Sequence, residues 1–106
     1  MNINMESITK LCEKGSLRWT NHVLVRLLQR GITTNDVVYA LQNGEIIEQY
    51  PTDYPYPSCL ILGITLNDKH MHIVCGIGNI ELWLITAYYP NNDKWLNDFK
   101  TRKEHK

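Results

Sequence analysis

Hydrophobic residues recur every three or four positions in the first part of the chain, and this is the spacing of amphipathic helices. The pattern predicts three short helices, over residues 3–14, 21–31 and 33–43. A glycine stands at or directly after the end of each one, as is common at helix C-termini. Thr33 is followed by Asp36 at a spacing that resembles a capping box, although a standard box has Glu or Gln at the second position.

After position 44 the chain changes to short apolar runs rich in β-branched and aromatic residues, which indicates strands. Four strands are predicted, over residues 45–50, 59–66, 70–77 and 81–89. Turn signals separate the last three, so we expect these to pair as an antiparallel meander. The tail is expected to start a last turn or helix around Trp95 and then to fray. The pattern predicts a single α+β domain over residues 1–106, with helices first and a four-stranded sheet after them.

Composition and charge narrow the classes of function. The 106 residues include 11 basic and 11 acidic side chains, so the formal net charge is zero. A nucleic-acid binder that relies on bulk electrostatics carries a basic excess, so a phosphate site here has to come from a local arrangement. No apolar run approaches the roughly 18 residues of a membrane span, and the N-terminus does not have the pattern of a signal peptide. With three scattered cysteines and no CxxC pair, we expect reduced thiols, a cytoplasmic location and no membrane partner.

A row of basic side chains lies along the second predicted helix. His22, Arg26 and Arg30 are spaced four residues apart, so they stack on one side of the helix with no acid between them. Such neighbours repel one another by a few tenths of a kcal/mol per pair, and a bound anion would relieve the repulsion. Three interpretations remain open. A phosphate or acidic partner binds the row, the row is a solvated surface stripe, or it forms salt bridges to acids such as Glu45, Glu48 or Asp53.

Polar side chains also gather on the last two predicted strands. The two-residue period of a strand puts His70 and His72 on one face of strand 70–77. On the final strand it places four side chains together, Leu82, Leu84, Thr86 and Tyr88. If the two strands align, His72 lies beside Thr86 or Tyr88.

These groups are the parts needed to cleave a phosphodiester. An imidazole can act as base for a 2′-hydroxyl, guanidinium groups can hold the phosphate charge, and a phenol or imidazole can protonate the leaving oxygen. The alternatives are a packed or hydrogen-bonded histidine, or a transition metal held by His70 and His72. No third ligand with recognisable spacing accompanies that pair, so we expect no metal and no cofactor.

Two further segments carry candidate RNA contacts. Tyr50, Tyr54 and Tyr56 alternate with prolines in a stiff loop, where exposed rings would stack on unpaired bases. The other interpretation is that the loop covers one end of the sheet. The tail is basic and either is a solvated terminus or adds phosphate contacts. Its cations are Lys100, Arg102, Lys103 and Lys106.

Several motifs resemble those of the family known as domain of unknown function 4258, over about residues 20–102. The most specific is NGEIIEQYPTDYPYPSCLILG, residues 43–63. Shorter ones are His22 with Arg26, RGI, DV, HIV, ITAYYP and KW…DFKTR. This family is distantly similar to the RelE/ParE-type toxins of bacterial toxin–antitoxin pairs. The resemblance implies helices packed on a curved, mainly antiparallel sheet, with the functional face in its concavity.

The resemblance also implies a function. It suggests the toxin of a type II toxin–antitoxin system, partnered by a cognate antitoxin. The implied activity is a metal-independent endoribonuclease, an mRNA interferase acting on RNA that is free or associated with the ribosome. Carried over to this chain, the candidate catalytic residues are His22, Arg26, Arg30, His72, Thr86 and Tyr88. The alternative from another class is a non-catalytic toxin that inhibits a protein target such as gyrase.

Overall fold

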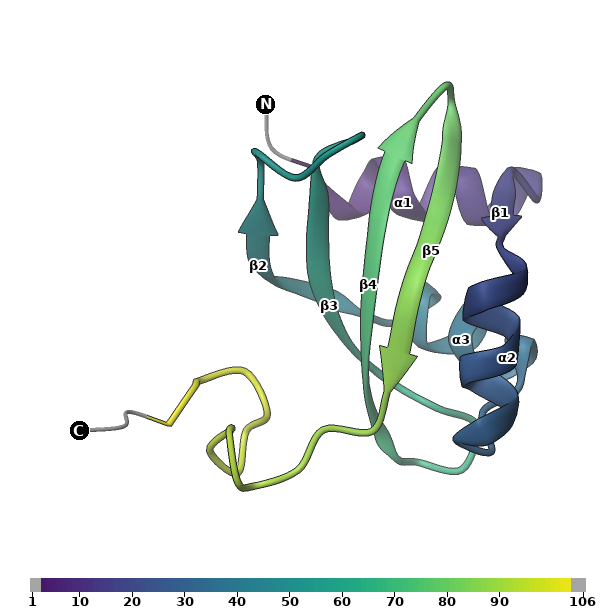
Figure 1. Ribbon diagram of the computed structural model, residues 1–106. Helices are drawn as coiled ribbons and strands as arrows, with labels where there is room; N and C mark the ends of the chain where they lie inside the picture. Colours follow the sequence, from purple (N-terminus) through teal and green to yellow (C-terminus); the bar gives the residue numbers. More distant parts are fainter. Residues whose placement is uncertain (1–2, 104–106) are drawn as a thin grey trace.

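The computed structural model describes residues 3–103, and Lys106 of the basic tail lies outside these residues. Within them, helices α1 and α3 pack on one face of a five-stranded mixed sheet, and α2 lies beside β5 (Figure 1). The helices are Met5–Lys14, Asn21–Gln29 and Thr34–Gln42. The strands β1 to β5 are Leu17–Trp19, Glu45–Tyr50, Ser58–Ile64, His70–Gly78 and Glu81–Tyr88. The predicted α+β class is confirmed.

All three predicted helices are present, and side chains cap their first turns. Thr20 accepts a hydrogen bond from the backbone of Val23 at the start of α2. At the start of α3, Thr33 and Asp36 form the reciprocal pair of a capping box, so Asp serves in place of Glu or Gln. Gly31 follows α2 with φ of 68°, a conformation that glycine adopts without strain. These local signals explain why the helices could be predicted from sequence.

The sheet order is β1-β5-β4-β3-β2, and β2 to β5 pair antiparallel as predicted. The prediction of four strands was wrong, because residues Leu17–Trp19 add a fifth strand parallel to β5. Three residues are too few to show a two-residue period, and they pair with residues 65 positions later in the chain, as Leu17 does with Leu82. Because β1 pairs only with residues 82–84 of β5, the lower half of β5 has no strand neighbour on that side.

A β-bulge at Ile85 decides which side chains of β5 face which layer. Val74 pairs with Thr86 and Cys75 with Leu84, so Ile85 is the extra residue. Leu84 therefore points into the core under the helices, whereas Thr86 and Tyr88 lie on the opposite face. The prediction that Leu82, Leu84, Thr86 and Tyr88 share one face was wrong for this reason.

The core lies between the helices and the sheet. Its side chains come from both layers, and burying each aliphatic one contributes about 1.5–3 kcal/mol. Helix α3 sits so close to β3 that a Cβ on Gly63 would lie 2.1 Å from the carbonyl oxygen of Ala40. No helix within residues 3–103 is long and apolar enough to cross a membrane. Cys12, Cys59 and Cys75 are free thiols.

Candidate functional site

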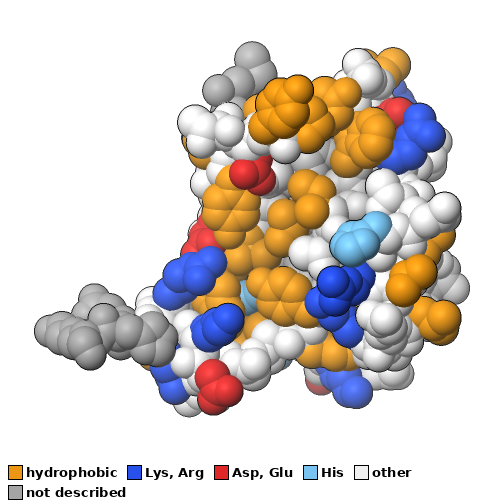
Figure 2. Space-filling model, in the orientation of Figure 1, with side chains coloured by type: hydrophobic (Ala, Val, Ile, Leu, Met, Phe, Trp, Pro, Cys, Tyr) orange, Lys and Arg blue, Asp and Glu red, His pale blue; other side chains and the backbone are white. Residues whose placement is uncertain are grey.

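The face of the sheet opposite α1 and α3 carries polar and aromatic side chains, and we call it the open face. Figure 2 shows it with basic side chains on both sides of a hydrophobic surface near its lower end, and a histidine above one of these basic groups. Residues 90–103, here called the tail, run from the end of β5 across the lower end of this face toward β2 (Figure 1). The candidate residues therefore lie between α2, β5 and the tail.

Arg30 connects the basic row of α2 to the open face. Its Nη1 donates hydrogen bonds to Thr86 Oγ1 at 3.0 Å and to the Ala87 carbonyl oxygen at 2.9 Å. The contact is possible because this part of β5 has no strand neighbour on the α2 side, which leaves the Ala87 carbonyl free to accept. The row and the β5 side chains thus belong to one surface, as the sequence interpretation required.

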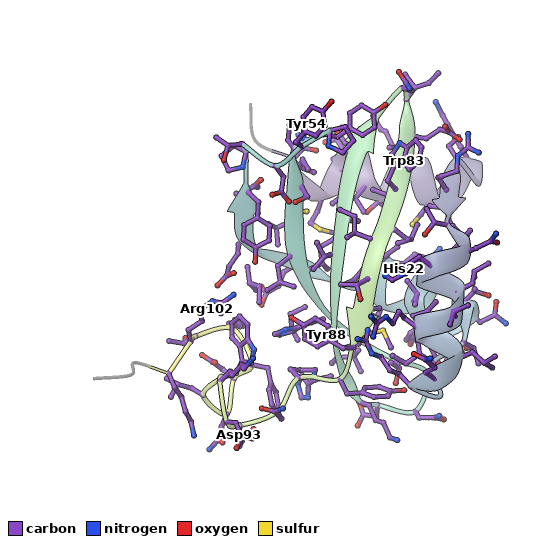
Figure 3. All side chains as sticks on the ribbon, in the orientation of Figure 1. His22, Tyr54, Trp83, Tyr88, Asp93 and Arg102 are labelled. Carbon is purple, nitrogen blue, oxygen red and sulfur yellow. The ribbon has the colours of Figure 1, made fainter. Side chains whose placement is uncertain are left out.

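His22 and Arg26 are exposed on the same row. Figure 3 shows His22 on the side of α2 that borders β5. Within residues 3–103 neither side chain makes a hydrogen bond or an ion pair. The acids proposed as partners bond elsewhere, since Glu45 pairs with Lys100 and Glu48 with Arg102, both at 2.7 Å. The row is therefore open to an anion from outside.

His72 is fully buried under the tail. Its Nε2 lies 2.7 Å from the carbonyl oxygen of Phe99, which can only accept, so Nε2 carries the proton. Its Nδ1 then accepts from the Tyr88 hydroxyl at 3.3 Å. Burial lowers the pKa of His72 and favours this neutral form, although the Phe99 hydrogen bond partly opposes the shift. An enclosed imidazole does not touch a substrate, so any role of His72 in this arrangement acts through Tyr88.

Tyr88 stands directly opposite His72 in the strand register and is half-buried. The charges of Arg102 and Arg30 lower the pKa of its phenol, and the charge of Glu48 raises it. Burial has the larger effect and raises the pKa of Tyr88 overall. The phenol is therefore protonated near neutral pH and lies beside a cationic surface, where it can give a proton to a strong base such as a departing alkoxide.

Arg102 and Lys100 hold the tail against β2. Arg102 forms a bidentate pair with Glu48 and covers the ring of Trp95 at 4.6 Å. The Arg102 hydrogen bond lowers the pKa of Glu48. Tyr50 donates its hydroxyl to Glu48, and burial together with this bond raises the pKa of Tyr50 to about 12. The candidate RNA contacts Tyr50, Lys100 and Arg102 thus border the open face, and their side chains are already bonded to acids of the protein.

Tyr54 and Tyr56 lie at the other end of the sheet, near Trp83 and far from Tyr88 (Figure 3). The ring of Tyr54 is 94% exposed, whereas that of Tyr56 packs against Trp83 with centroids 5.7 Å apart. The fold does not bring these tyrosines to the basic row. Nucleic-acid stacking by Tyr54 stays a prediction for a separate part of the surface.

The tail contributes residues to this region that the sequence interpretation did not single out for function. Trp95 is 3% exposed and its ring meets that of His72 edge-on at 4.6 Å. Of the last turn or helix expected around Trp95, the structure has turns at residues 92–94 and 97–98 and no helix within residues 90–103, and Trp95 and Arg102 form a single bridge. The one sequence signal was the aromatic spacing of Trp95 and Phe99. In the described chain, no group of three or more His, Cys, Asp or Glu side chains is placed to hold a metal.

Comparison with known proteins gives one family match. The family model described as "Domain of unknown function (DUF4258)" matches residues 19–89, about two thirds of the chain. This span runs from β1 to the end of β5 and includes the six candidate catalytic residues, but stops before the tail. No curated protein and no solved structure matches the chain. The chain belongs to the DUF4258 family.

Proposed function

We propose that this protein is the toxin of a bacterial type II toxin–antitoxin pair and that it cleaves RNA on its open face without a metal. The observation that carries the proposal is the contact of Arg30 with Thr86 and Ala87. It joins a basic row, which has no acidic partner among residues 3–103, to a strand face that carries a phenol and a supporting imidazole. The likeness to RelE/ParE-type toxins, with RNA as substrate and an antitoxin as partner in the cytoplasm, is part of the proposal.

The phosphate is held by Arg26 and Arg30. Guanidinium groups bind phosphate oxygens in pairs. Arg30 uses one of its nitrogens for β5, which fixes the side chain and leaves its remaining donors for the ligand. Arg26, four residues earlier and unpaired within the described chain, supplies the second fork. Together they stabilise the charge that develops on the phosphate in the transition state.

The proposed reaction is attack of the 2′-hydroxyl on the adjacent phosphorus. His22 takes the proton of the 2′-hydroxyl, since histidine is the side chain that exchanges protons most readily near neutral pH. The new bond joins the 2′ oxygen to phosphorus, and the bond from phosphorus to the 5′ oxygen breaks. Tyr88 gives its proton to the departing 5′ alkoxide, a stronger base than a phenolate. Protonated His22 then releases its proton to the solvent and Tyr88 regains one from it, so both groups return to their starting state. The products are a 2′,3′-cyclic phosphate and a 5′-hydroxyl.

His72 is a positioning residue in this scheme. The Phe99 carbonyl fixes its proton on Nε2, and the unprotonated Nδ1 holds the Tyr88 hydroxyl. Phe99 has φ of 56°, a conformation uncommon for a bulky residue, and the tail around it is held by the Arg102–Glu48 pair. The tail thus sets the tautomer of His72 and through it the orientation of the phenol.

Incubation with single-stranded RNA in EDTA tests the proposal. We expect discrete fragments that end in a cyclic phosphate, and no cleavage where the scissile nucleotide is 2′-deoxy. Arg26→Ala removes an exposed guanidinium and should abolish cleavage. Lys10→Ala is the matched control, because Lys10 is an exposed cation on α1, on the helix-covered side. RNA that stays intact over a wide range of concentrations of folded protein would reject the proposal.

A non-catalytic toxin remains the second candidate. The zero net charge and the 94% exposed ring of Tyr54 suit recognition of a protein such as gyrase. Expression in bacteria separates the two candidates. Arrested translation supports RNA cleavage, whereas filamentation with DNA damage supports inhibition of a protein target. Co-expression with the product of an adjacent antitoxin gene should suppress either effect.

A further inference from the structure

The end of β5 and the tail enclose a depression of about 420 Å³ that the proposed cleavage step leaves unused. Its lining includes Tyr88, Asn91, Lys94, Trp95 and Arg102. The volume falls in the range of roughly 300–1,000 Å³ that is typical of small-ligand sites. Because Tyr88 lines it, the depression opens directly beside the phosphate site proposed above.

Two polar side chains of the depression, Asn91 and Lys94, offer free hydrogen-bond donors. Asn91 uses its side-chain oxygen to accept from the backbone of Asp93 at 3.0 Å, which leaves its amide NH₂ for a ligand. The ammonium of Lys94 is exposed and makes no ion pair with any described residue. The remaining lining comes from three aromatic residues, Tyr88, Tyr89 and Trp95, and from Pro90 and Arg102, whose guanidinium is bonded to Glu48. The site thus combines an aromatic wall with two donors.

We propose that this depression binds one nucleobase of the RNA, next to the scissile phosphate, and that it prefers the keto bases guanine and uracil. This inference rests on the proposed function, since it takes the phosphate to lie at Arg30. Thr86 and Tyr88 are two residues apart on one face of β5, about 7 Å along the strand. A phosphate beside Thr86 and a base beside Tyr88 are then neighbours on the same surface.

The preference follows from the donors. Guanine presents O6 and N7 as acceptors, and uracil presents carbonyl oxygens, so both can accept from Asn91 and Lys94. Adenine and cytosine present an amino group at the corresponding position. That amino group is itself a donor and would face the donors of the protein. Replacing one accepting carbonyl by a donating amino group corresponds to about a tenfold loss of affinity for the base.

Binding can be measured apart from cleavage by NMR titration of the intact protein. GMP and UMP should shift the side-chain amide of Asn91 and the indole N–H of Trp95, with affinities about tenfold above those of AMP and CMP. Inorganic phosphate is the control and should leave these two signals unmoved. Equal shifts with all four nucleotides would overturn the keto preference, and no shift with any of them would overturn the site.

Cleavage by variants gives the second test. Lys94→Ala and Asn91→Ala change exposed side chains and should raise KM for RNAs with a guanine or uracil beside the cut, leaving kcat unchanged. The matched controls Lys14→Ala, on α1, and Asn92→Ala change exposed side chains outside the lining and should leave KM unchanged. Efficient cleavage with unchanged base preference in both variants would reject the subsite and keep the proposed function. Keto-selective nucleotide binding without any RNA cleavage would keep the subsite and reject the catalytic proposal.

Discussion

Tyr88 and His72 face each other across β5 and β4, and the phenol of the first lies 3.3 Å from Nδ1 of the second. This pairing depends on the bulge at Ile85, which turns the end of β5 over so that Tyr88 shares the face of His72. Tyr88 is half-buried and accessible, whereas His72 is enclosed. In the proposed reaction, the proton-transfer role therefore belongs to Tyr88, and His72 holds the phenol in place.

Tyr88→Phe should remove the proton donor and preserve the ring. We expect kcat for RNA cleavage to fall about 100-fold, the lower end of the usual contribution of acid–base catalysis, with KM little changed. Tyr39→Phe is the control, because Tyr39 is an exposed tyrosine on α3, away from the open face. Wild-type kcat in Tyr88→Phe would show that the phenol does not transfer the proton.

The burial of His72 predicts that stability depends on pH. Its pKa is lowered in the folded protein, chiefly by burial, so the unfolded chain takes up a proton first as the pH falls. The contribution of neutral His72 is complete above about pH 6.5 and is lost as the pH drops through its lower folded pKa. Glu48, Arg102 and His70 are the charged or titratable groups that act on it.

Chemical unfolding of wild type and His72→Gln between pH 7.5 and 5 measures this contribution. Gln keeps a donor for the Phe99 carbonyl but does not titrate, so the free energy of unfolding should fall less with pH than in wild type. Parallel curves for His72→Gln and wild type would contradict the prediction.

Loss of Arg102 should loosen the tail. Arg102→Ala removes the bidentate bond to Glu48 and the cover over Trp95. Since the pair is partly exposed, we expect the free energy of unfolding to fall by only about 1 kcal/mol. Amide hydrogen exchange should accelerate between residues 94 and 103, and at His72, much more than in the core strands. Lys10→Ala breaks an exposed helix pair and should change neither quantity noticeably. Unchanged exchange in the tail would mean that other contacts hold it.

The parts of the fold that the sequence predicted correctly are those with local causes. Helices α2 and α3 carry their own caps in Thr20 and Thr33, and the β3–β5 meander alternates with short turns. Strand β1 and the bulge at Ile85 depend on partners far along the chain. No local sequence pattern marks these two features. The predicted number of strands and the predicted face of Thr86 and Tyr88 on β5 were therefore wrong.

The candidate site also has features with local causes and features that depend on long-range contacts. Helical periodicity alone placed His22, Arg26 and Arg30 in one row. Periodicity could not show that Arg30 contacts β5 or that the tail encloses His72, because both are contacts between distant segments. The family match likewise stops at residue 89 and includes none of the tail.

Arg30→Lys tests whether the link between α2 and β5 matters for cleavage. Lys keeps the charge but replaces the planar fork with a compact ammonium, which does not bond β5 and a phosphate in the same geometry. We expect kcat/KM to fall about tenfold or more, as for the loss of one strong transition-state contact. Arg26→Lys should lose less, because Arg26 has no contact with β5 to keep. Arg18→Lys, in an ion pair with Glu81 at the other end of the sheet, should retain wild-type cleavage. If Arg30→Lys and Arg18→Lys cleave RNA equally well, the convergence of α2 and β5 has no part in the chemistry, and the site must be sought elsewhere on the molecule.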